Sequence, residues 1–253
     1  MKVIALTYAY DMPKLMDIGR KWAPSVYGDK EFIFEYSAAS YATFLDKHRD
    51  LTLHLYTDDI ELLKSKMEKY NVPQNIVYVD FSEDINKLSN SKYSFDMLTH
   101  FIYSAKSDKE FTVKIDNDLV FFGSLPTPPE NSVFVWKYER LVREGDPRMG
   151  EIKVVQDTVG DVDLPIYNLG VLGIPHDFPE QELKDICEKM VNVDITSVSD
   201  LGVKIWHCAE QTANNWIFKN KGYNIVQTYN IVDHLYDNKK ACIERAKHLL
   251  KHE

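Results

Sequence analysis

The 253-residue sequence contains few cysteines, no long apolar run and no excess of positive charge. Cys187, Cys208 and Cys242 are an odd number and form no C-x-x-C pair, so neither a disulfide framework nor a zinc cluster is predicted. No run of about 18 apolar residues exists, which argues against a membrane span. The apolar run at the N-terminus is too short for a secretory signal. We therefore expect a cytoplasmic protein.

The formal net charge of −9 at pH 7 lacks the basic footprint that nucleic-acid-binding proteins usually carry. We therefore expect no nucleic-acid partner. A small anionic ligand is compatible with this charge, because a metal ion, a few lysines or a helix N-terminus can hold such a ligand locally.

In the first half of the chain, short β-rich apolar runs alternate with segments of helical periodicity. Strands are predicted over residues 2–10, 50–59 and 75–81 and in the run that leads to Asp116, and helices over 60–72 and 93–107. This alternation predicts an α/β fold with a central, mostly parallel sheet flanked by helices.

In the second half, strands are predicted over 132–142 and 164–175, and helices over 179–191 and 209–222. The segment 143–163 between the two strands is polar, so we expect a loop there that covers a site as a lid or contacts an acceptor. The final helix is expected to bury one stripe of residues: Cys242, Ala246, Leu249 and Leu250.

Polar residues follow the predicted strands. Thr7, Tyr8 and Tyr10 close the first strand, and Asp58 closes the second. Ligands bind beyond the carboxyl ends of the strands in sheets of this class, so these residues are candidates for holding one. A plain strand end explains the first three equally well, and Asp58 could instead cap the helix that follows it.

An acidic pair interrupts the apolar run "FTVKIDNDLVFF", where Asp116 and Asp118 flank Asn117. Aspartate and asparagine are common turn residues, so a plain turn is one interpretation. Two carboxylates at i and i+2 on extended chain also point to the same side, close enough to share one Mg²⁺ or Mn²⁺ ion. The apolar strand before the pair favours the metal site. The other such pair, Asp161 and Asp163, lies in a polar segment and is expected to form a turn.

Three later stretches complete a resemblance to a known family. "YNLGVLGI" contains Asn168 and Gly170, "EQTANN" begins with Glu210 and Gln211, and His234 precedes a lysine, Lys239, by five residues. Together with the D-x-D these motifs resemble the GT-A glycosyltransferases of the glycogenin and bacterial galactosyltransferase type, which hold a nucleotide-diphospho-sugar through a divalent metal. In those enzymes the asparagine faces the donor sugar and the glycine gives room to it.

The sequence departs from the family pattern in three places. The family's glycine and tryptophan after the late histidine are missing after His234, which weakens the assignment of Lys239. Thr212 stands where the family has a second aspartate in its D-Q-D motif. The predicted helix over 93–107 lacks the arginine that reaches the phosphates in the family, and Lys92 or Lys114 would have to replace it.

The resemblance implies a metal-dependent glycosyltransferase that moves a hexosyl or pentosyl group from a nucleotide-sugar, most simply UDP-linked, to a hydroxyl acceptor such as a glycan. It implies one GT-A-like domain over 1–253, with a nucleotide-binding half (1–125) and an acceptor and donor-sugar half (126–253). The implied metal ligands, for Mn²⁺ or Mg²⁺, are Asp116, Asp118 and His234. The implied catalytic residues are Glu210 and Gln211. The implied nucleotide-sugar-binding residues are Thr7, Tyr8, Tyr10, Asp58, Lys92, Lys114, Asn117, Asn168, Gly170 and Lys239.

Two other classes stay open. A sugar-phosphate nucleotidyltransferase uses a similar fold, although "LTYAYDMPKL" after the first strand lacks the glycine-rich basic loop of such enzymes. A non-catalytic nucleotide-sugar-binding module would keep the fold without turnover. If the metal site is correct, Asp118→Ala is expected to abolish metal-dependent UDP binding without loss of fold.

Overall fold

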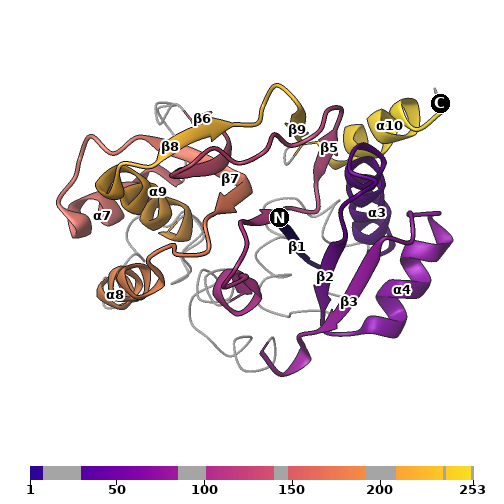
Figure 1. Cartoon of the computed structure of the whole chain (residues 1–253), viewed down its shortest axis with the longest axis horizontal. Coiled ribbons are helices and arrows are strands. Elements are labelled where there is room, and N and C mark those ends of the chain that lie inside the picture. Colours follow the sequence, from indigo (N-terminus) through magenta and orange to yellow (C-terminus); the bar gives the residue numbers. More distant parts are fainter. Residues whose placement is uncertain (8–29, 85–100, 140–147, 192–208, 236–237, 252–253) are drawn as a thin grey trace.

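The computed structural model describes residues 1–7, 30–84, 101–139, 148–191, 209–235 and 238–251 (Figure 1). Its central sheet has seven strands, in the order β3 (Ile76–Asp80), β2 (Leu53–Thr57), β1 (Lys2–Leu6), β4 (Thr112–Ile115), β7 (Ile166–Ile174), β6 (Ser132–Glu139) and β8 (Asn224–Gln227). A second sheet pairs β5 (Leu119–Phe121) with β9 (Val232–His234).

The central sheet is mostly parallel. β1 runs parallel to β2 and β4, and β2 runs parallel to β3. β7 is antiparallel to both β4 and β6, and β8 is again parallel to β6. The predicted α/β class with a mostly parallel sheet is therefore confirmed.

Apolar layers lie on both faces of this sheet. Along β1, Val3 and Ala5 point into the layer covered by α3 (Lys30–Lys47), whereas Ile4 points into the layer covered by α8 (Glu180–Val191) and α9 (Ala209–Lys221). Figure 1 shows α3 on the right of the sheet and α8 and α9 on the left. Burial on both faces is why β1 is a continuous apolar run rather than an alternating one.

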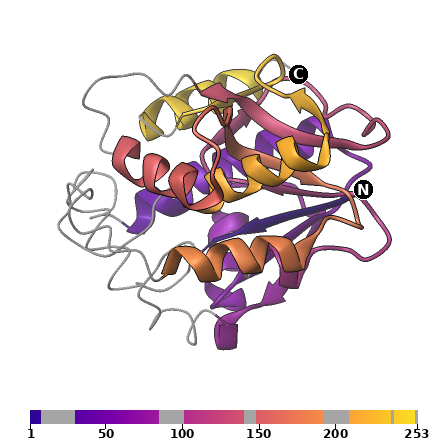
Figure 2. The ribbon, with the colours of Figure 1, turned by 90° about the vertical axis from the view of Figure 1, so that its left-hand side faces the viewer.

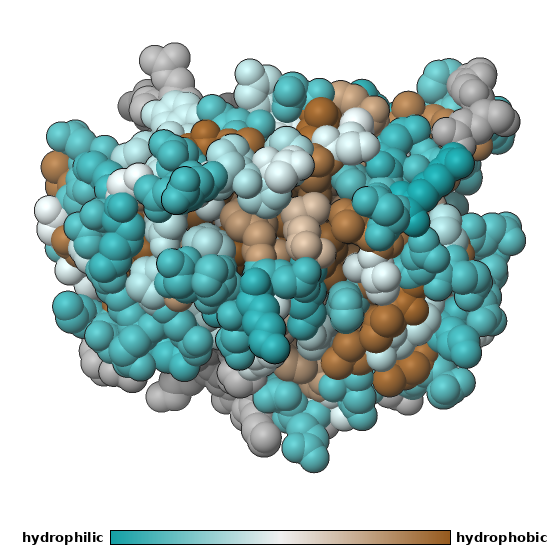
Figure 3. Space-filling view, viewed as in Figure 1, coloured by the Kyte–Doolittle hydropathy of each residue, from teal (hydrophilic) through white to brown (hydrophobic). Residues whose placement is uncertain are grey.

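The carboxyl ends of the parallel strands face away from the viewer of Figure 1. Figure 2 shows this from the side, where β1 runs leftward from the N-terminus. Figure 3 therefore shows the amino edge, which hydrophilic side chains cover for the most part. Apolar atoms reach this surface at the lower right, over β2 and β3, and Val77 on β3 is 45% exposed. The expected ligand edge lies on the opposite side.

The sequence patterns missed α3, an 18-residue helix. Its buried positions surround the helix rather than forming one stripe, so no helical period stands out. Its polar side chains face β5, where the Ser40 Oγ accepts a hydrogen bond from the Leu119 backbone N–H (3.2 Å) and the Thr43 Oγ1 accepts one from that of Phe121 (3.1 Å). These two bonds hold β5 directly after the acidic pair.

The loop predicted over 143–163 is wrong for most of its described part. Residues Arg148–Val159 form helix α7, and buried Ile152 packs against Leu164 and Ile166. The many charged residues hid this helix, because tertiary packing through few apolar contacts stabilises it. The helix ends at Gly160 (φ +72°), and the Asp161 after it pairs with Lys219 (2.7 Å).

The other predicted helices are present where the structure describes them. Helix α4 (Ile60–Lys69) is capped by Asp59, whose side chain accepts from the Leu62 N–H (3.0 Å). Of the helix predicted over 93–107, residues 101–107 are described, and 101–105 of these are helical. Among the described residues, no helix has the length and hydropathy of a membrane-spanning segment.

The final helix, α10 (Lys239–Leu249), packs against α3, and the predicted stripe is confirmed at Cys242, Ala246 and the partly buried Leu249 but not at Leu250. Cys242, Ile243 and Ala246 are buried, whereas Leu250 is 40% exposed. Leu250 lies past the helix end as its C-cap residue, so it cannot continue the stripe.

Candidate metal centre

The acidic pair lies in a turn at the carboxyl end of a central strand. β4 ends at Ile115, the chain turns, and β5 starts at Leu119 in the small sheet. Backbone bonds hold both aspartates, because the Asp116 N–H donates to the Gly170 carbonyl (2.8 Å) and the Asp118 carbonyl accepts from the Leu235 N–H (3.0 Å). The turn interpretation and the site interpretation are therefore compatible, since the turn carries both carboxylates to the ligand edge.

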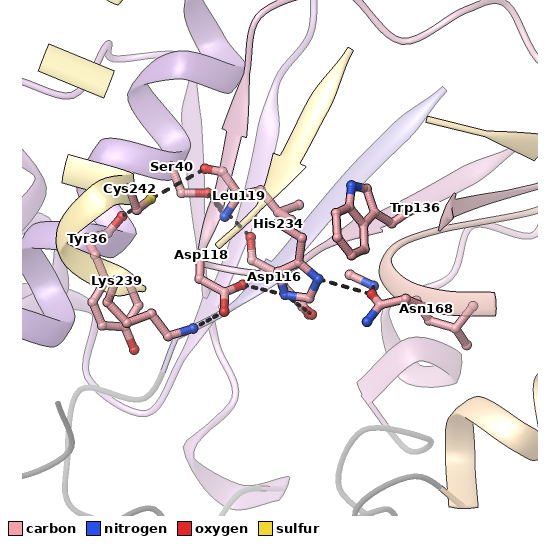
Figure 4. Close-up of polar contacts among 12 residues, drawn as sticks. Tyr36, Ser40, Asp116, Asp118, Leu119, Trp136, Asn168, His234, Lys239 and Cys242 are labelled. Carbon is pink, nitrogen blue, oxygen red and sulfur yellow. Dashed lines mark hydrogen bonds and ion pairs between the residues drawn. The ribbon is translucent and has the colours of Figure 1, made fainter. Parts of the chain in front are cut away.

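His234 joins the two aspartates. In the small sheet β9 pairs with β5, which sets His234 opposite Leu119 and beside Asp118. One ligand atom from each of Asp116, Asp118 and His234 lies within 4.8 Å of the others. The His234 Nε2 is 3.0 Å from the Asp118 Oδ1 and 3.9 Å from the Asp116 Oδ2 (Figure 4). The three residues predicted as metal ligands are thus brought together.

Two buried lysines orient the carboxylates. The Lys114 Nζ pairs with the Asp116 Oδ1 and donates to the Leu169 carbonyl (3.0 Å). The Lys239 Nζ, from the first turn of α10, pairs with the Asp118 Oδ2. Each lysine thus occupies one oxygen of its aspartate, and the second oxygen of each is the one closer to His234.

The charges of this cluster stabilise one another. Burial raises the pKa of Asp118, but His234 and Lys239 outweigh that effect and hold the pKa below its usual range. Burial lowers the pKa of Lys114, but Asp116, with a smaller contribution from Glu210, outweighs it and keeps the pKa above its usual value. Asp118 therefore presents a carboxylate at neutral pH.

The residues present fit a hard divalent cation. The buried Asp118 Oδ1 makes no hydrogen bond of acceptable geometry, although the His234 Nε2 is close to it. Two carboxylate oxygens and one imidazole nitrogen form a donor set that suits Mn²⁺, and oxygen ligands alone suit Mg²⁺. Asp116 and Asp118, with His234, are the residues that would hold such an ion.

Glu210 and Gln211 lie in the first turn of α9, which packs against β7. Glu210 is buried, and among the described residues its Oε1 has no hydrogen-bond partner. Burial raises its pKa to about 7, since Lys114 offsets only part of the desolvation and Asp116 adds to the shift. The Gln211 Nε2 donates to the Glu139 Oε2 (3.1 Å).

Asn168 and Gly170 lie on β7 next to His234. The Asn168 Oδ1 is 3.0 Å from the His234 Nδ1, and its Nδ2 donates to the Glu139 Oε1 (2.8 Å). A Cβ on Gly170 would lie 2.6 Å from the His234 Nδ1. The space that the glycine leaves is therefore filled by the imidazole ring in this structure.

The remaining predicted binding residues are more dispersed. The buried Thr7 hydroxyl shares a hydrogen bond with the Tyr41 hydroxyl (2.6 Å). Asp58 is half-buried and leaves the capping of α4 to its neighbour Asp59, while Asn117 is half-buried within the turn. Tyr8, Tyr10 and Lys92 lie outside the described residues.

Sequence reasoning missed Glu139, whose carboxylate accepts from both Asn168 and Gln211. A usable signal existed, because Glu139 is a charged residue at the end of the apolar run of β6. Sequence reasoning also missed Trp136, whose ring packs edge-on against His234 at a centroid distance of 5.1 Å.

No family model matches the sequence, and neither does any curated protein. Solved structures of glycosyltransferases match almost the whole chain. The galactosyltransferase LgtC, in complex with donor and acceptor sugar analogs, is 14% identical over 99% of this chain and 95% of its own, with a TM-score of 0.51. Mouse xyloside xylosyltransferase 1, in its apo form, is 11% identical over 90% of this chain and 84% of its own, with the same TM-score of 0.51.

At these identities the likeness concerns the fold. The chain has the GT-A fold of these glycosyltransferases, as the D-x-D, Asn-x-Gly and late histidine motifs predicted.

Proposed function

We infer that this chain is a metal-dependent glycosyltransferase that moves a sugar from a nucleotide-diphospho-sugar, most simply a UDP-sugar, to a hydroxyl acceptor such as a glycan. The observation that carries this proposal is the convergence of Asp116, Asp118 and His234 at the carboxyl edge of a sheet with the GT-A fold. Neighbouring structures with the same fold are named as sugar transferases, and one of them was solved with donor and acceptor sugar analogs.

The proposed roles follow from the chemistry of the donor. Breaking the bond at the anomeric carbon leaves negative charge on the diphosphate, and a divalent cation held by the three ligands would stabilise that charge. Lys239 is a candidate cation for the diphosphate, because it lies at the start of α10 and its ammonium group pairs with the ligand Asp118. Lys114 is less available, because it is already bound to the Leu169 carbonyl as well as to Asp116.

Glu210 and Gln211 are the proposed residues at the reacting sugar. Gln211 presents an amide that Glu139 holds in place. Glu210 supplies a carboxyl group that can accept or return a proton near neutral pH, the range in which acid–base catalysis is most effective.

Titration of UDP with and without Mn²⁺ tests the proposal. We expect UDP to raise the melting temperature only when Mn²⁺ is present, since the diphosphate would bind through the cation. Incubation with a panel of UDP-sugars should then show slow hydrolysis of one donor even without an acceptor. A cation-independent response to UDP, or none, would overturn the metal-dependent transferase. Binding without any donor turnover in the presence of candidate acceptors would favour a non-catalytic module.

Glu210→Gln is expected to raise stability at high pH and to lower activity. The pKa of Glu210 rises from 4.5 to about 7 on folding, so the folded state binds the proton more tightly than the unfolded chain. Stability from this group is present at low pH and is lost as pH rises toward 7, to a total of about 3 kcal/mol. The free energy of unfolding of the glutamine variant, relative to that of the parent, should therefore be higher at about pH 8 than at about pH 5. Urea unfolding at both pH values measures this gain, and a pH-independent difference would contradict it.

A further inference from the structure

The His234 ring is held from several sides. Its Nδ1 faces the Asn168 Oδ1 (3.0 Å), its Nε2 faces Asp118, and the ring packs on Trp136 and against the bare backbone of Gly170. Figure 4 shows the imidazole between Asp118 on one side and Asn168 on the other, with Asp116 next to the ring. The ring therefore has one nitrogen directed to the candidate cation site and the other directed to an amide.

The orientation of the Asn168 amide follows from two partners of known polarity. The Gly170 backbone N–H can only donate, and it lies 2.8 Å from the Oδ1 of Asn168. The Glu139 carboxylate can only accept, and its Oε1 lies 2.8 Å from the Nδ2. Both contacts place the oxygen of the amide toward His234 and the nitrogen away from it.

This orientation places a proton on the Nδ1 of His234. An amide oxygen accepts, so the Nδ1 of the ring must carry the proton in their contact. A neutral ring with a proton on Nδ1 has its lone pair on Nε2, the nitrogen nearest to Asp118 and Asp116. Only a nitrogen with a free lone pair can bind a metal ion.

We propose that Asn168 and Glu139 are positioning residues that hold His234 in its cation-binding tautomer, with Glu139 orienting the amide and Asn168 the imidazole. The proposal rests on the proposed function, because it assigns an outer shell to that cation site. Such partners of a ligating histidine fix its tautomer and its ring orientation.

Glu139 also links this outer shell to the sugar side of the site. Its second oxygen accepts from the Gln211 amide (3.1 Å), while the first holds Asn168. The Glu139 carboxylate at the end of β6 therefore accepts hydrogen bonds from an amide on β7 and from an amide on α9. Either amide can be removed by a single substitution.

Calorimetric titration of Mn²⁺ into purified variants tests the proposal. Asn168→Ala removes the acceptor and should weaken Mn²⁺ binding by about 10- to 100-fold. The double variant Asn168→Asp with Glu139→Gln keeps the shape and total charge of the pair and reverses only the donor between them, so its affinity should be comparable with that of the parent. Gln211→Ala, the matched control, leaves the contact between Asn168 and Glu139 intact and should bind Mn²⁺ like the parent.

Nitrogen-15 NMR of the imidazole provides a readout that does not depend on activity. In protein loaded with Zn²⁺, a diamagnetic ion that accepts imidazole, the His234 Nδ1 should be protonated and the Nε2 metal-bound. Metal binding through Nδ1 would overturn the proposal. Circular dichroism melts establish that each variant is folded, and the double variant tests the proposal even if Asn168→Ala does not fold.

The outcomes separate this proposal from the function. Equal Mn²⁺ affinity in the parent and Asn168→Ala would overturn the outer shell and leave the metal-dependent transferase intact. Absence of Mn²⁺ binding in the parent protein would overturn the metal site itself and the outer shell with it.

Discussion

Asp118→Ala is expected to abolish Mn²⁺-dependent UDP binding and also to destabilise the fold strongly. The first effect follows from its place among the ligands. The second arises because Asp118 pairs with Lys239, whose side chain is only 7% exposed. Breaking a buried ion pair by removing one partner costs about 3–5 kcal/mol, since the other charge stays buried alone. The expectation from sequence, that this substitution spares the fold, is therefore revised.

A double variant separates these two effects. Asp118→Ala combined with Lys239→Met removes both charges, and replacing a whole buried pair by apolar groups is often neutral in stability. We expect the double variant to recover most of the lost stability in urea unfolding while still failing to bind UDP with Mn²⁺. Equal stability of the parent and the single variant would contradict the role of the pair, and parent-like UDP and Mn²⁺ binding in either variant would contradict the ligand assignment.

Asp116→Ala provides a second comparison at the same site. Asp116 is 33% exposed, and its partner Lys114 keeps the Leu169 carbonyl and the charge of Glu210. This variant should lose Mn²⁺-dependent UDP binding as completely as Asp118→Ala but lose less stability. Both aspartates are thus proposed metal ligands, but Asp118 is expected to contribute more than Asp116 to the free energy of unfolding.

Gly170→Ala is expected to weaken Mn²⁺ binding severely, because the new methyl group would collide with a ligand. A Cβ there would lie 2.6 Å from the Nδ1 and 2.8 Å from the Cε1 of His234. Contacts this short force the ring to move, and overpacking of this kind costs about 1–3 kcal/mol. The displaced ring loses both its contact with Asn168 and its approach to the aspartates.

Gly173→Ala is the matched control on the same strand. Its Cβ would lie 2.7 Å from the Phe111 Cε1 and 2.7 Å from the Phe134 Cβ, so a similar clash arises far from His234. We expect a comparable loss of stability with parent-like Mn²⁺ affinity. Thermal unfolding and Mn²⁺ titration of both variants measure the two quantities. If both glycines lower the affinity equally, the loss reflects general destabilisation rather than displacement of His234.

Local patterns predicted six of the seven strands of the central sheet, all but β8, and the strand end at which the candidate site lies. Apolar runs predicted β1, β2, β3, β4, β6 and β7, because a strand that is buried on both faces is apolar at nearly every consecutive residue. The same runs placed Asp116 and Asp118 at a strand end. They did not predict α3, whose buried positions surround the helix, or α7, which packs through few apolar side chains.

Contacts between residues that are distant in the sequence could be identified only from the folded structure. The sequence offered the acidic pair, Asn168 and His234 as separate motifs. Lys114 and Lys239 were assigned to the nucleotide-sugar, and only the folded chain shows that they pair with the two aspartates.

The acidic pair was visible in the sequence because it interrupts an apolar run, and periodicity depends only on neighbouring residues. Its surroundings were not, because Glu139, Asn168 and His234 meet through strand pairings and side-chain contacts that join residues far apart along the chain. The register of those pairings, set by side-chain packing on both sheet faces, decides which polar side chains surround the turn.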